Sequence, residues 1–285
     1  MTNAEQIEYW NGDAGKRWAQ EDDTMARLLR PVSEALLDHA QIAGCRKALD
    51  IGCGGGSQSL MLAQRLGAGA TVLGVDISAP MLQVSQAKAA EPAHDSANLT
   101  FLQTDAATHA FDANAFDLVF SRFGVMFFDD PVGAFSNIRK ALSSQARLAF
   151  CCWQPLKDNA WTRIPLQAAL QHLPAPQAAD PQAPGPFAFA DPHRVQNILQ
   201  SSGFKDIVVE SFTMDMRFSE APTLQQSVRE LAMIGPVSRL LTGQDAAVIE
   251  RVFSTMEEAL APHYQDGVLS LPGAIWFVTA KTDQD

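Results

Sequence analysis

The sequence predicts an open α/β fold, in which a mostly parallel sheet is covered by helices on both faces. Apolar runs of strand length alternate with helix-periodic segments along the first half of the chain. These runs are apolar on both sides, as expected for strands buried on both faces. The first run ends in the acid and glycine cluster Asp50–Gly56, which is typical of a tight turn between a strand and a helix.

Composition narrows the class of protein. The chain has 285 residues, 47% of them hydrophobic, and a formal net charge of -11. This supports a buried core, and the acidic surface disfavours nucleic acid as a partner. No signal peptide or membrane-spanning run is evident, and no cysteine pair has CxxC spacing. We therefore expect a cytoplasmic protein with reduced, buried thiols, no metal and no membrane span.

The first half is expected to hold five strands and four main helices. Strands are predicted over 47–51, 71–76, 99–105, 116–122 and 147–153. Helices are predicted over 25–43, 57–66, 78–90 and 130–142, where apolar residues recur at helical spacing. Gly44 and Gly67 are natural helix stops, and Ser78 is a natural N-cap.

The two ends of the chain are less regular. Residues 4–24 have helical spacing that Asn11–Gly12 interrupts, and their tryptophans either form a lid or only staple the segment to the domain. Residues 154–190 are rich in Pro, Ala and Gln, with a short helix near Trp161 and a loop over 174–186. The expected elements that follow are a helix at 191–203, a strand at 205–217, helices at 222–235 and 245–263, and a last apolar strand before residue 280.

Polar residues stand at the ends of four predicted strands. They are Asp50 with its glycines, Asp76, Asp105 and Ser121–Arg122. The carboxyl ends of parallel strands meet at one edge of the sheet, where such folds bind ligands. Asp76 lies about 20 residues after the last loop glycine, a distance that suits an acid binding ribose hydroxyls. Asp105 could accept a hydrogen bond from an adenine amine, and Ile77 and Met81 could contact the base.

The glycine spacing argues against phosphate-bearing cofactors. It is Gly52-x-Gly54-x-Gly56, and a dinucleotide site has G-x-G-x-x-G. Asp50 just ahead of the loop would repel a pyrophosphate, and no Gly-Lys-Ser/Thr follows it. S-adenosylmethionine carries a ribose, an adenine, an amino acid and a sulfonium, but no phosphate.

Four motifs together carry a resemblance. They are 48–56, 75–78, 105–106 and 116–128, with Tyr9–Gly12 at the start. The chain resembles the class I S-adenosylmethionine-dependent methyltransferases, in the small-molecule branch with ubiquinone/menaquinone C-methyltransferase-like proteins. The resemblance implies a Rossmann-like, seven-stranded sheet with an antiparallel final strand in one domain, 1–285. Within it, 1–43 would be a helical lid, 44–153 the cofactor-binding core, and 154–192 and 220–264 the substrate cap.

The resemblance also implies roles for single residues. Gly52, Cys53 and Gly54 would lie under the amino acid part of the cofactor, and Asp50 would set its amino end through the loop. Asp76 would hold the ribose, and Asp105 with the Ala106 N–H would read the adenine edge. Ser121 would line the methyl end. Trp10 and Trp18 would close over the cofactor.

The implied reaction is methyl transfer to O, N or C of a small, fairly apolar metabolite. It needs proximity and orientation, and a base only if the acceptor must lose a proton. His172, His193, His263 and Tyr264 are candidates that packing or surface roles explain better, so no catalytic residue is assigned. Arg122 is either an ion-pair partner of Asp129 or Asp130 or a substrate contact.

Two other functions stay open at this point. One is a non-catalytic protein that binds the cofactor on the same fold, and the other is a nicotinamide-dependent oxidoreductase, which the glycine spacing disfavours. The acceptor and the oligomeric state are not given by the sequence, and a homodimer is left open.

Overall fold

The computed structural model describes residues 2–90, 96–176 and 180–283. It divides into two compact units. The core unit comprises Met1–Cys152, Gln182–Ser211 and Trp276–Asp285, and the second unit comprises Trp153–Pro181 and Phe212–Ile275. Whether the second unit forms a substrate cap, and residues 1–43 a lid, within one methyltransferase domain stays a prediction.

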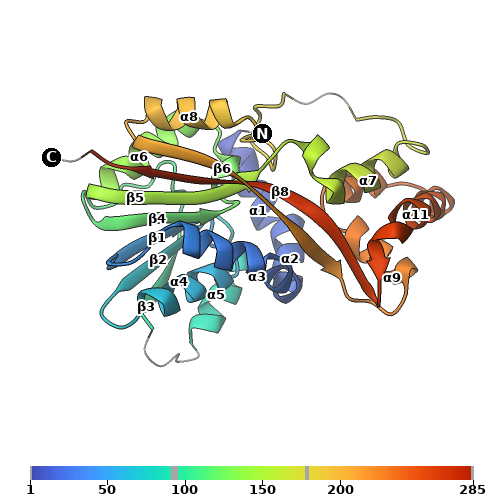
Figure 1. Cartoon of the computed structure of the whole chain (residues 1–285), viewed down its shortest axis with the longest axis horizontal. Coiled ribbons are helices and arrows are strands. Elements are labelled where there is room, and N and C mark those ends of the chain that lie inside the picture. The colour runs from blue at the N-terminus through green and yellow to red at the C-terminus, as the bar shows by residue number, and fades with distance from the viewer. Residues whose placement is uncertain (1, 91–95, 177–179, 284–285) are drawn as a thin grey trace. The chain divides into compact units, whose positions relative to one another are not determined.

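The described residues hold one sheet of eight strands, in the order β3-β2-β1-β4-β5-β8-β6, with the short β7 paired to β8 (Figure 1). The strands are β1 (Lys47–Ile51), β2 (Thr71–Asp76), β3 (Asn98–Gln103), β4 (Phe116–Arg122), β5 (Leu142–Trp153), β6 (Lys205–Ser219), β7 (Tyr264–Gln265) and β8 (Val268–Lys281). Strands β1 to β5 pair in parallel, and the C-terminal strands run antiparallel. The predicted fold class is confirmed, with β7 as an unpredicted addition.

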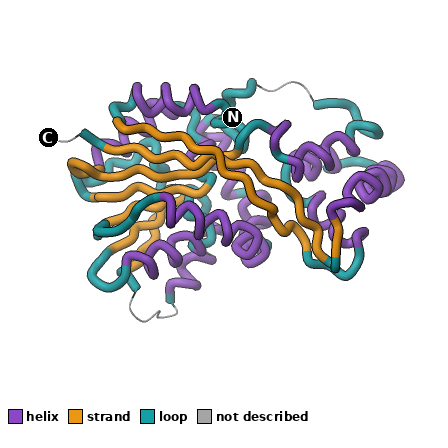
Figure 2. Tube along the Cα trace, in the orientation of Figure 1, coloured by secondary structure: helices purple, strands orange, loops and turns teal. Residues whose placement is uncertain are grey.

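Helices cover both faces of the sheet in the core unit (Figure 2). They are α1 (Asn3–Asn11), α2 (Asp13–Gln20), α3 (Asp22–His39), α4 (Ser57–Leu66), α5 (Ala79–Ala89), α6 (Pro131–Ala141) and α8 (Pro192–Ser201). Helices α3 and α4 contact each other, as do α6 and α8. A short 3₁₀ helix, η1 (Val125–Phe127), follows β4.

The core forms where the central strands are apolar on both sides. Leu49, Phe120 and Phe150, on β1, β4 and β5, are fully buried. Phe135 of α6 packs against Phe150 with ring centroids 5.7 Å apart. Burial of aromatic rings of this size supplies much of the free energy that holds the helices on the sheet.

Several predicted boundaries lie elsewhere in the structure. Helix α3 ends at His39 because Gln41 takes a left-handed φ of 49°, and the chain turns there before Gly44. Strand β3 ends at Gln103, so Asp105 lies in the following turn. Strand β5 begins at Leu142, five residues before the predicted start, because the polar segment 143–145 joins the strand without an apolar signal.

The second unit holds the helices of the variable region. They are α7 (Ala160–Ala169), α9 (Leu224–Ala232), α10 (Pro236–Leu241) and α11 (Ala246–Leu260). Helix α10 was not predicted, because the range 222–235 gives no sign that a new helix begins at Pro236 after Gly235, whose φ is 73°. The predicted loop 174–186 lies partly outside the described residues.

One buried amide organises the start of this unit. Asn159 is fully buried, and its Nδ2 donates to the carbonyls of Gln154 at 3.0 Å and Ala274 at 3.1 Å. Its Oδ1 accepts from the Ala274 N–H at 2.9 Å and from Trp161 Nε1 at 3.1 Å. The side chain thus joins the segment after β5 to strand β8.

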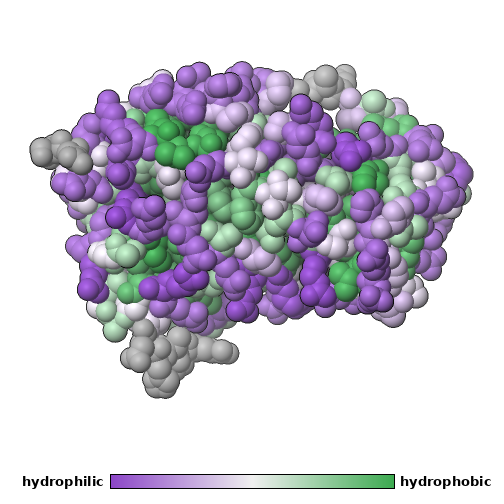
Figure 3. Space-filling view, viewed as in Figure 1, coloured by the Kyte–Doolittle hydropathy of each residue, from purple (hydrophilic) through white to green (hydrophobic). Residues whose placement is uncertain are grey.

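The described residues contain no helix long and apolar enough to cross a membrane. The face in Figure 3 shows hydrophobic patches separated by hydrophilic residues.

Asn159→Ala removes the shared acceptor of the Ala274 N–H and Trp161 Nε1 and takes a donor from the Gln154 and Ala274 carbonyls, so it should lower the free energy of unfolding by on the order of 2–4 kcal/mol. Urea unfolding followed by circular dichroism measures this. Gln226→Ala, at an exposed position of α9, is the matched control and should change stability by less than about 0.5 kcal/mol. Equal stability of the two variants would contradict the assigned role of Asn159.

Candidate cofactor site

The loops after β1 and β4 approach each other too closely for any residue but glycine. Gly52 has a φ of 66°, and a Cβ on it would lie 2.7 Å from the Cα of Gly124. The backbone N–H groups of Gly52 and Cys53 donate to the Val75 carbonyl at 2.9 and 3.1 Å. The glycine loop is therefore fixed against both neighbouring strands.

Asp76 joins this loop to the loop after β2. Its Oδ2 accepts from the Gly54 N–H at 2.9 Å, and its Oδ1 accepts from the Ser78 N–H at 2.8 Å. Burial raises the pKa of Asp76, and these backbone hydrogen bonds oppose the rise. The Asp76 side chain thus fixes the loop after β1 against the loop after β2. The resemblance assigns both loops to the cofactor.

Asp50 lies deeper, one residue before the end of β1. It is 1% exposed, and its Oδ2 accepts from Ser59 Oγ at 2.6 Å. Its Oδ1 is buried without a partner among the described residues. Burial raises the pKa of Asp50 to about 7, although the Ser59 hydroxyl and the Arg122 charge both lower it. A carboxyl group with this pKa is typical of a functional site.

The end of β4 is strained and tightly bonded. Ser121 Oγ donates to the Ile51 carbonyl at 2.8 Å and accepts from the Gly124 N–H at 3.2 Å. Phe123 takes a left-handed φ of 63°, a conformation that a bulky residue seldom adopts outside functional sites. The Ser121 hydroxyl is therefore occupied in fixing the backbone beside the glycine loop.

The Asp105 turn already holds a partner. Asp105 Oδ2 accepts from Asn3 Nδ2 at 2.8 Å, and its Oδ1 accepts from the Ala107 N–H at 2.9 Å. The Asn3 amide therefore donates to Asp105, the carboxylate that we expected to accept a hydrogen bond from an adenine amine. Ala106 is buried, and its carbonyl accepts from Asn137 Nδ2 at 3.3 Å.

The apolar candidates line the same edge. Met81 is buried, with its terminal methyl 3.2 Å from the place of a Cβ on Gly54. The carbonyl of Ile77 accepts from Asn11 Nδ2 at 2.9 Å. Cys53 is a buried free thiol, as are the other cysteines, so the predicted burial of the thiols is confirmed.

The N-terminal helices pack on this edge through polar and aromatic contacts. Asn11 Oδ1 also accepts from the Ala79 N–H at 2.9 Å, and the Trp10 carbonyl accepts from Ser78 Oγ at 2.7 Å. The Trp10 ring makes edge contacts with Phe127 and Trp18, with centroids 5.5 and 6.1 Å apart. Trp18 itself is 38% exposed. The break predicted at Asn11–Gly12 is thus the point where the N-terminal helices bind the loop after β2.

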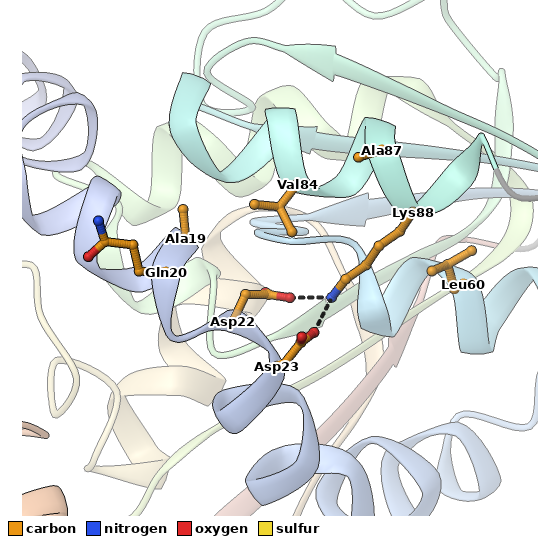
Figure 4. Close-up of a pocket in the computed structure, with 8 residues that line it drawn as sticks. All are labelled: Ala19, Gln20, Asp22, Asp23, Leu60, Val84, Ala87 and Lys88. Carbon is orange, nitrogen blue, oxygen red and sulfur yellow. Dashed lines mark hydrogen bonds and ion pairs between the residues drawn. The ribbon is translucent and has the colours of Figure 1, made fainter.

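An ion pair joins the start of helix α3 to helix α5. Lys88 of α5 pairs with Asp22 and Asp23 at the start of α3, and Asp22 stands over Gly55, where a Cβ would overlap its carboxylate (Figure 4). A hollow of about 410 Å³ lies here, and none of the predicted site residues line it. Its lining residues are Ala19, Gln20, Asp22, Asp23, Leu60, Val84, Ala87 and Lys88.

The described residues have few buried polar side-chain atoms without a partner. They are Gln6 Nε2, Asp50 Oδ1, both amide atoms of Gln58, Arg122 Nε and Arg147 Nη1. Gln6 lies in α1 and Gln58 in α4, and Asp50 and Arg122 lie near the ends of β1 and β4. An unpaired polar group is costly at such buried positions. A glycine cradle with an unpaired carboxylate and no built phosphate site fits S-adenosylmethionine.

Three comparisons bear on this site. The family described as a methyltransferase domain matches residues 49–150. Nocamycin O-methyltransferase of Saccharothrix syringae is 28% identical over 71% of this chain and 75% of that protein. Aklanonic acid methyltransferase of Streptomyces sp. (strain C5) is 31% identical over 50% of this chain and 67% of that protein.

The solved structures agree on the fold. Phosphoethanolamine N-methyltransferase 2 of Haemonchus contortus, in complex with S-adenosylmethionine, superposes with a TM-score of 0.58 at 18% identity, covering 97% of this chain and 59% of that one.

The sheet order and the acid-bearing strand ends define a Rossmann-like methyltransferase fold. The chain belongs to the methyltransferase family. It is a class I enzyme that uses S-adenosylmethionine to methylate a small molecule, so the predicted family, cofactor and reaction class are confirmed.

Several residues at this edge were not singled out from the sequence. They are Asn3, Asn11, Asp22 and Lys88, which attach the N-terminal helices to the core, and Gln58 as an unpaired buried amide. The dipeptide Asn11–Gly12 gave a signal, but only for a helix break. The partners of these side chains lie many residues away, and no local pattern reports them.

We predict that Asp50 makes stability depend on pH. The pKa of an unfolded Asp is about 3.9, so between about pH 4 and 7 the folded chain keeps a proton that the unfolded chain has lost. Stability therefore falls as pH rises, with a slope of up to about 1.4 kcal/mol per pH unit, and levels off above the folded pKa. Asp50→Asn removes this contribution.

Urea unfolding of both proteins from pH 4 to 8 measures it. The stability of the original protein minus that of Asp50→Asn should shrink up to about pH 7. A difference that is constant, or that grows with pH, would show that Asp50 is not a buried acid with a raised pKa.

Asn11→Ala should loosen the attachment of helix α1 to the core unit. It removes hydrogen bonds to the backbone of Ile77 and Ala79, so amide exchange in α1 should become roughly 5- to 30-fold faster while α3 is unchanged. Hydrogen exchange with mass spectrometry measures this, with the exposed Glu8→Ala as control. Unchanged exchange in α1 would mean that Asn11 does not hold the segment.

Proposed function

We propose that this enzyme moves the methyl group of S-adenosylmethionine to O, N or C of a small, fairly apolar metabolite, with oxygen as the first acceptor atom to test. The observation that carries the proposal is the edge where Asp50, the glycine loop, Asp76 and Asp105 meet. The Saccharothrix relative is an O-methyltransferase by name, which supports the choice of oxygen.

We assign the amino acid half of the cofactor to the glycine loop. Gly52, Cys53 and Gly54 expose backbone that a ligand can approach closely, and helix α4 starts at the same place with free N–H groups. The unpaired Oδ1 of Asp50 supports a role in setting the amino end. Ser121, bonded to Ile51 and Gly124, supports the shape of the methyl end.

The nucleoside half is assigned to the next two strand ends. Asp76 has the acceptor oxygens that a ribose diol needs, and Ile77 and Met81 supply apolar contacts to the base. Asp105 and the Ala106 N–H would read the adenine edge, and adenine would then share Asp105 Oδ2 with Asn3 or displace it. Trp10 and Trp18 belong to the segment that would cover this half.

Bound S-adenosylmethionine supplies a methyl group on a positively charged sulfur, ready for displacement. The chain's own task is to orient it and exclude water, which alone accounts for large rate enhancements. Three of the four base candidates have other partners or are exposed: His172 Nε2 lies 2.8 Å from Thr255 Oγ1, Tyr264 donates to the Ala221 carbonyl at 2.7 Å, and His193 is exposed in α8. We therefore assign no catalytic residue.

We further propose that the enzyme works in the cytoplasm and without nucleic acid. The free buried cysteines support a reducing compartment, and the net charge of -11 supports the absence of a nucleic acid partner.

Asp76→Ala should weaken the binding of S-adenosylhomocysteine roughly 10- to 100-fold, because hydrogen bonds from the ribose to a carboxylate are lost. Isothermal titration calorimetry measures the Kd. Asp112→Ala removes an acid from an exposed loop position and should leave the Kd unchanged. If the original protein does not bind S-adenosylhomocysteine in the calorimeter, the proposed function is wrong.

Turnover then separates an enzyme from a protein that only binds. With methyl-labelled S-adenosylmethionine, a panel of phenols, hydroxyquinones and aromatic carboxylic acids should yield a labelled product that the Asp76→Ala variant makes far more slowly. Binding without transfer to any member of the panel would count against this acceptor class.

A further inference from the structure

Helix α1 buries a polar side chain and exposes an apolar one. Gln6 is 2% exposed, and it is the buried residue of this helix. Ile7, the apolar residue next to it, is 40% exposed. A helix that only packs on a domain turns its apolar side chains inward, because burying an amide without all of its hydrogen bonds is costly. The inward position of Gln6 therefore needs a reason other than packing.

The orientation of the Gln6 amide is fixed by Trp10. Trp10 Nε1 donates to Gln6 Oε1 at 3.2 Å. An indole N–H can only donate, so the amide atom that faces it must be the oxygen, and the other end of the amide must be Nε2. Nε2 is buried and has no partner among the described residues. It is therefore a buried donor whose partner would come from outside the chain.

Helix α1 lies across the two loops that we assign to the nucleoside. Asn3, one turn before Gln6, donates to Asp105 Oδ2 in the turn after β3 at 2.8 Å. Asn11, in the last turn of the helix, donates to the Ile77 carbonyl in the loop after β2 at 2.9 Å. Asn3 and Gln6 are three residues apart, so they lie on one face of the helix. Gln6 thus lies between the residues assigned to the adenine amine and to the apolar face of the base.

A carboxamide donor in this place suits a ring nitrogen of adenine. The adenine amine N6 is flanked by two acceptor nitrogens, N1 and N7, and a glutamine amide is a common partner of the edge that carries N6 and N7. In the proposed function, Asp105 binds N6, and the N–H of Ala106, the next residue in the chain, serves the N1 side. The strand ends then leave N7 without a donor.

We propose that Gln6 donates from Nε2 to N7 of the cofactor's adenine, and that this bond makes the affinity depend on N7. The inference rests on the proposed function, and it adds a contact from helix α1 to those from the strand ends. Since Nε2 is buried, the base reaches it only when α1 moves away from the strand ends and then packs on the bound base. The bond from Trp10 orients the amide before the base arrives.

The test compares two ligands that differ at one ring position. S-adenosylhomocysteine has N7, and its 7-deaza analogue has a C–H group in the same place. Isothermal titration calorimetry gives the Kd of each ligand for the original protein, Gln6→Met and Gln6→Glu. Met keeps the length of the side chain without the donor, and Glu keeps an acceptor for Trp10 but replaces the donor by a second acceptor. Glu8→Met, at an exposed position of α1, is the matched control.

The original protein should bind S-adenosylhomocysteine roughly 5- to 20-fold more tightly than the 7-deaza analogue, because one hydrogen bond from a buried donor is at stake. Gln6→Met should weaken only the first ligand, so that the two Kd values agree within about twofold. Gln6→Glu should bind the first ligand more weakly still, because its carboxylate faces the N7 lone pair. Glu8→Met should keep the full preference. If Gln6→Met does not fold, the preference of the original protein and its loss in Gln6→Glu still have to be observed.

Three results would overturn the inference. Equal affinity of the original protein for both ligands would mean that N7 accepts no hydrogen bond. Equal weakening of both ligands by Gln6→Met would mean that Gln6 only holds α1 in place. A preference that survives in Gln6→Met would mean that another group donates to N7. Failure of the original protein to bind S-adenosylhomocysteine would instead remove the proposed function, so the two failures are distinguishable.

Discussion

The carboxylate of Asp76 is the interaction from which the geometry of the site follows. Its two backbone hydrogen bonds hold the Gly54 loop and the Ser78 loop at a fixed separation. The N-terminal helices are attached to the second loop through Asn11 and Trp10, and to helix α5 through the ion pair of Asp22 with Lys88. On the other side, the contact of Gly52 with Gly124 sets the end of β4 against the first loop. The two loops and the N-terminal segment are thus positioned relative to one half-buried acid.

This arrangement is built from groups that are unfavourable in the folded chain on its own. Burial raises the pKa values of Asp50 and Asp76 and lowers that of Arg122. Phe123 adds a strained backbone beside them. Such a cluster is stabilised by the surrounding sheet and helices, and its charges are available to a ligand because no side chain neutralises them. The likeness to methyltransferases and the electrostatics of the site therefore point to the same edge of the sheet.

The fold was predictable where the signals are local. Strands β1, β2 and β4 and helix α4 have the predicted bounds, because apolar runs are closed by glycines and polar residues such as Gly67. Helix α10 and strand β7 were missed, since elements of that length depend on contacts that the sequence does not show. The grouping of the strand-end acids at one edge of the sheet was predictable from the parallel topology. The partners of Asn3, Asn11 and Arg122 were not predictable, because each of those hydrogen bonds joins residues 66 or more positions apart.

The pKa of Asp50 has a consequence for the heat of binding. With a pKa of about 7, part of the molecules carry a protonated Asp50 near neutral pH. A ligand whose ammonium group requires the carboxylate form would expel that proton into the buffer. Part of the enthalpy measured on mixing would then belong to the buffer and would differ between phosphate and Tris, although the contacts formed are identical. The proton on Asp50 therefore competes with the ligand, and the measured affinity of such a site depends on pH.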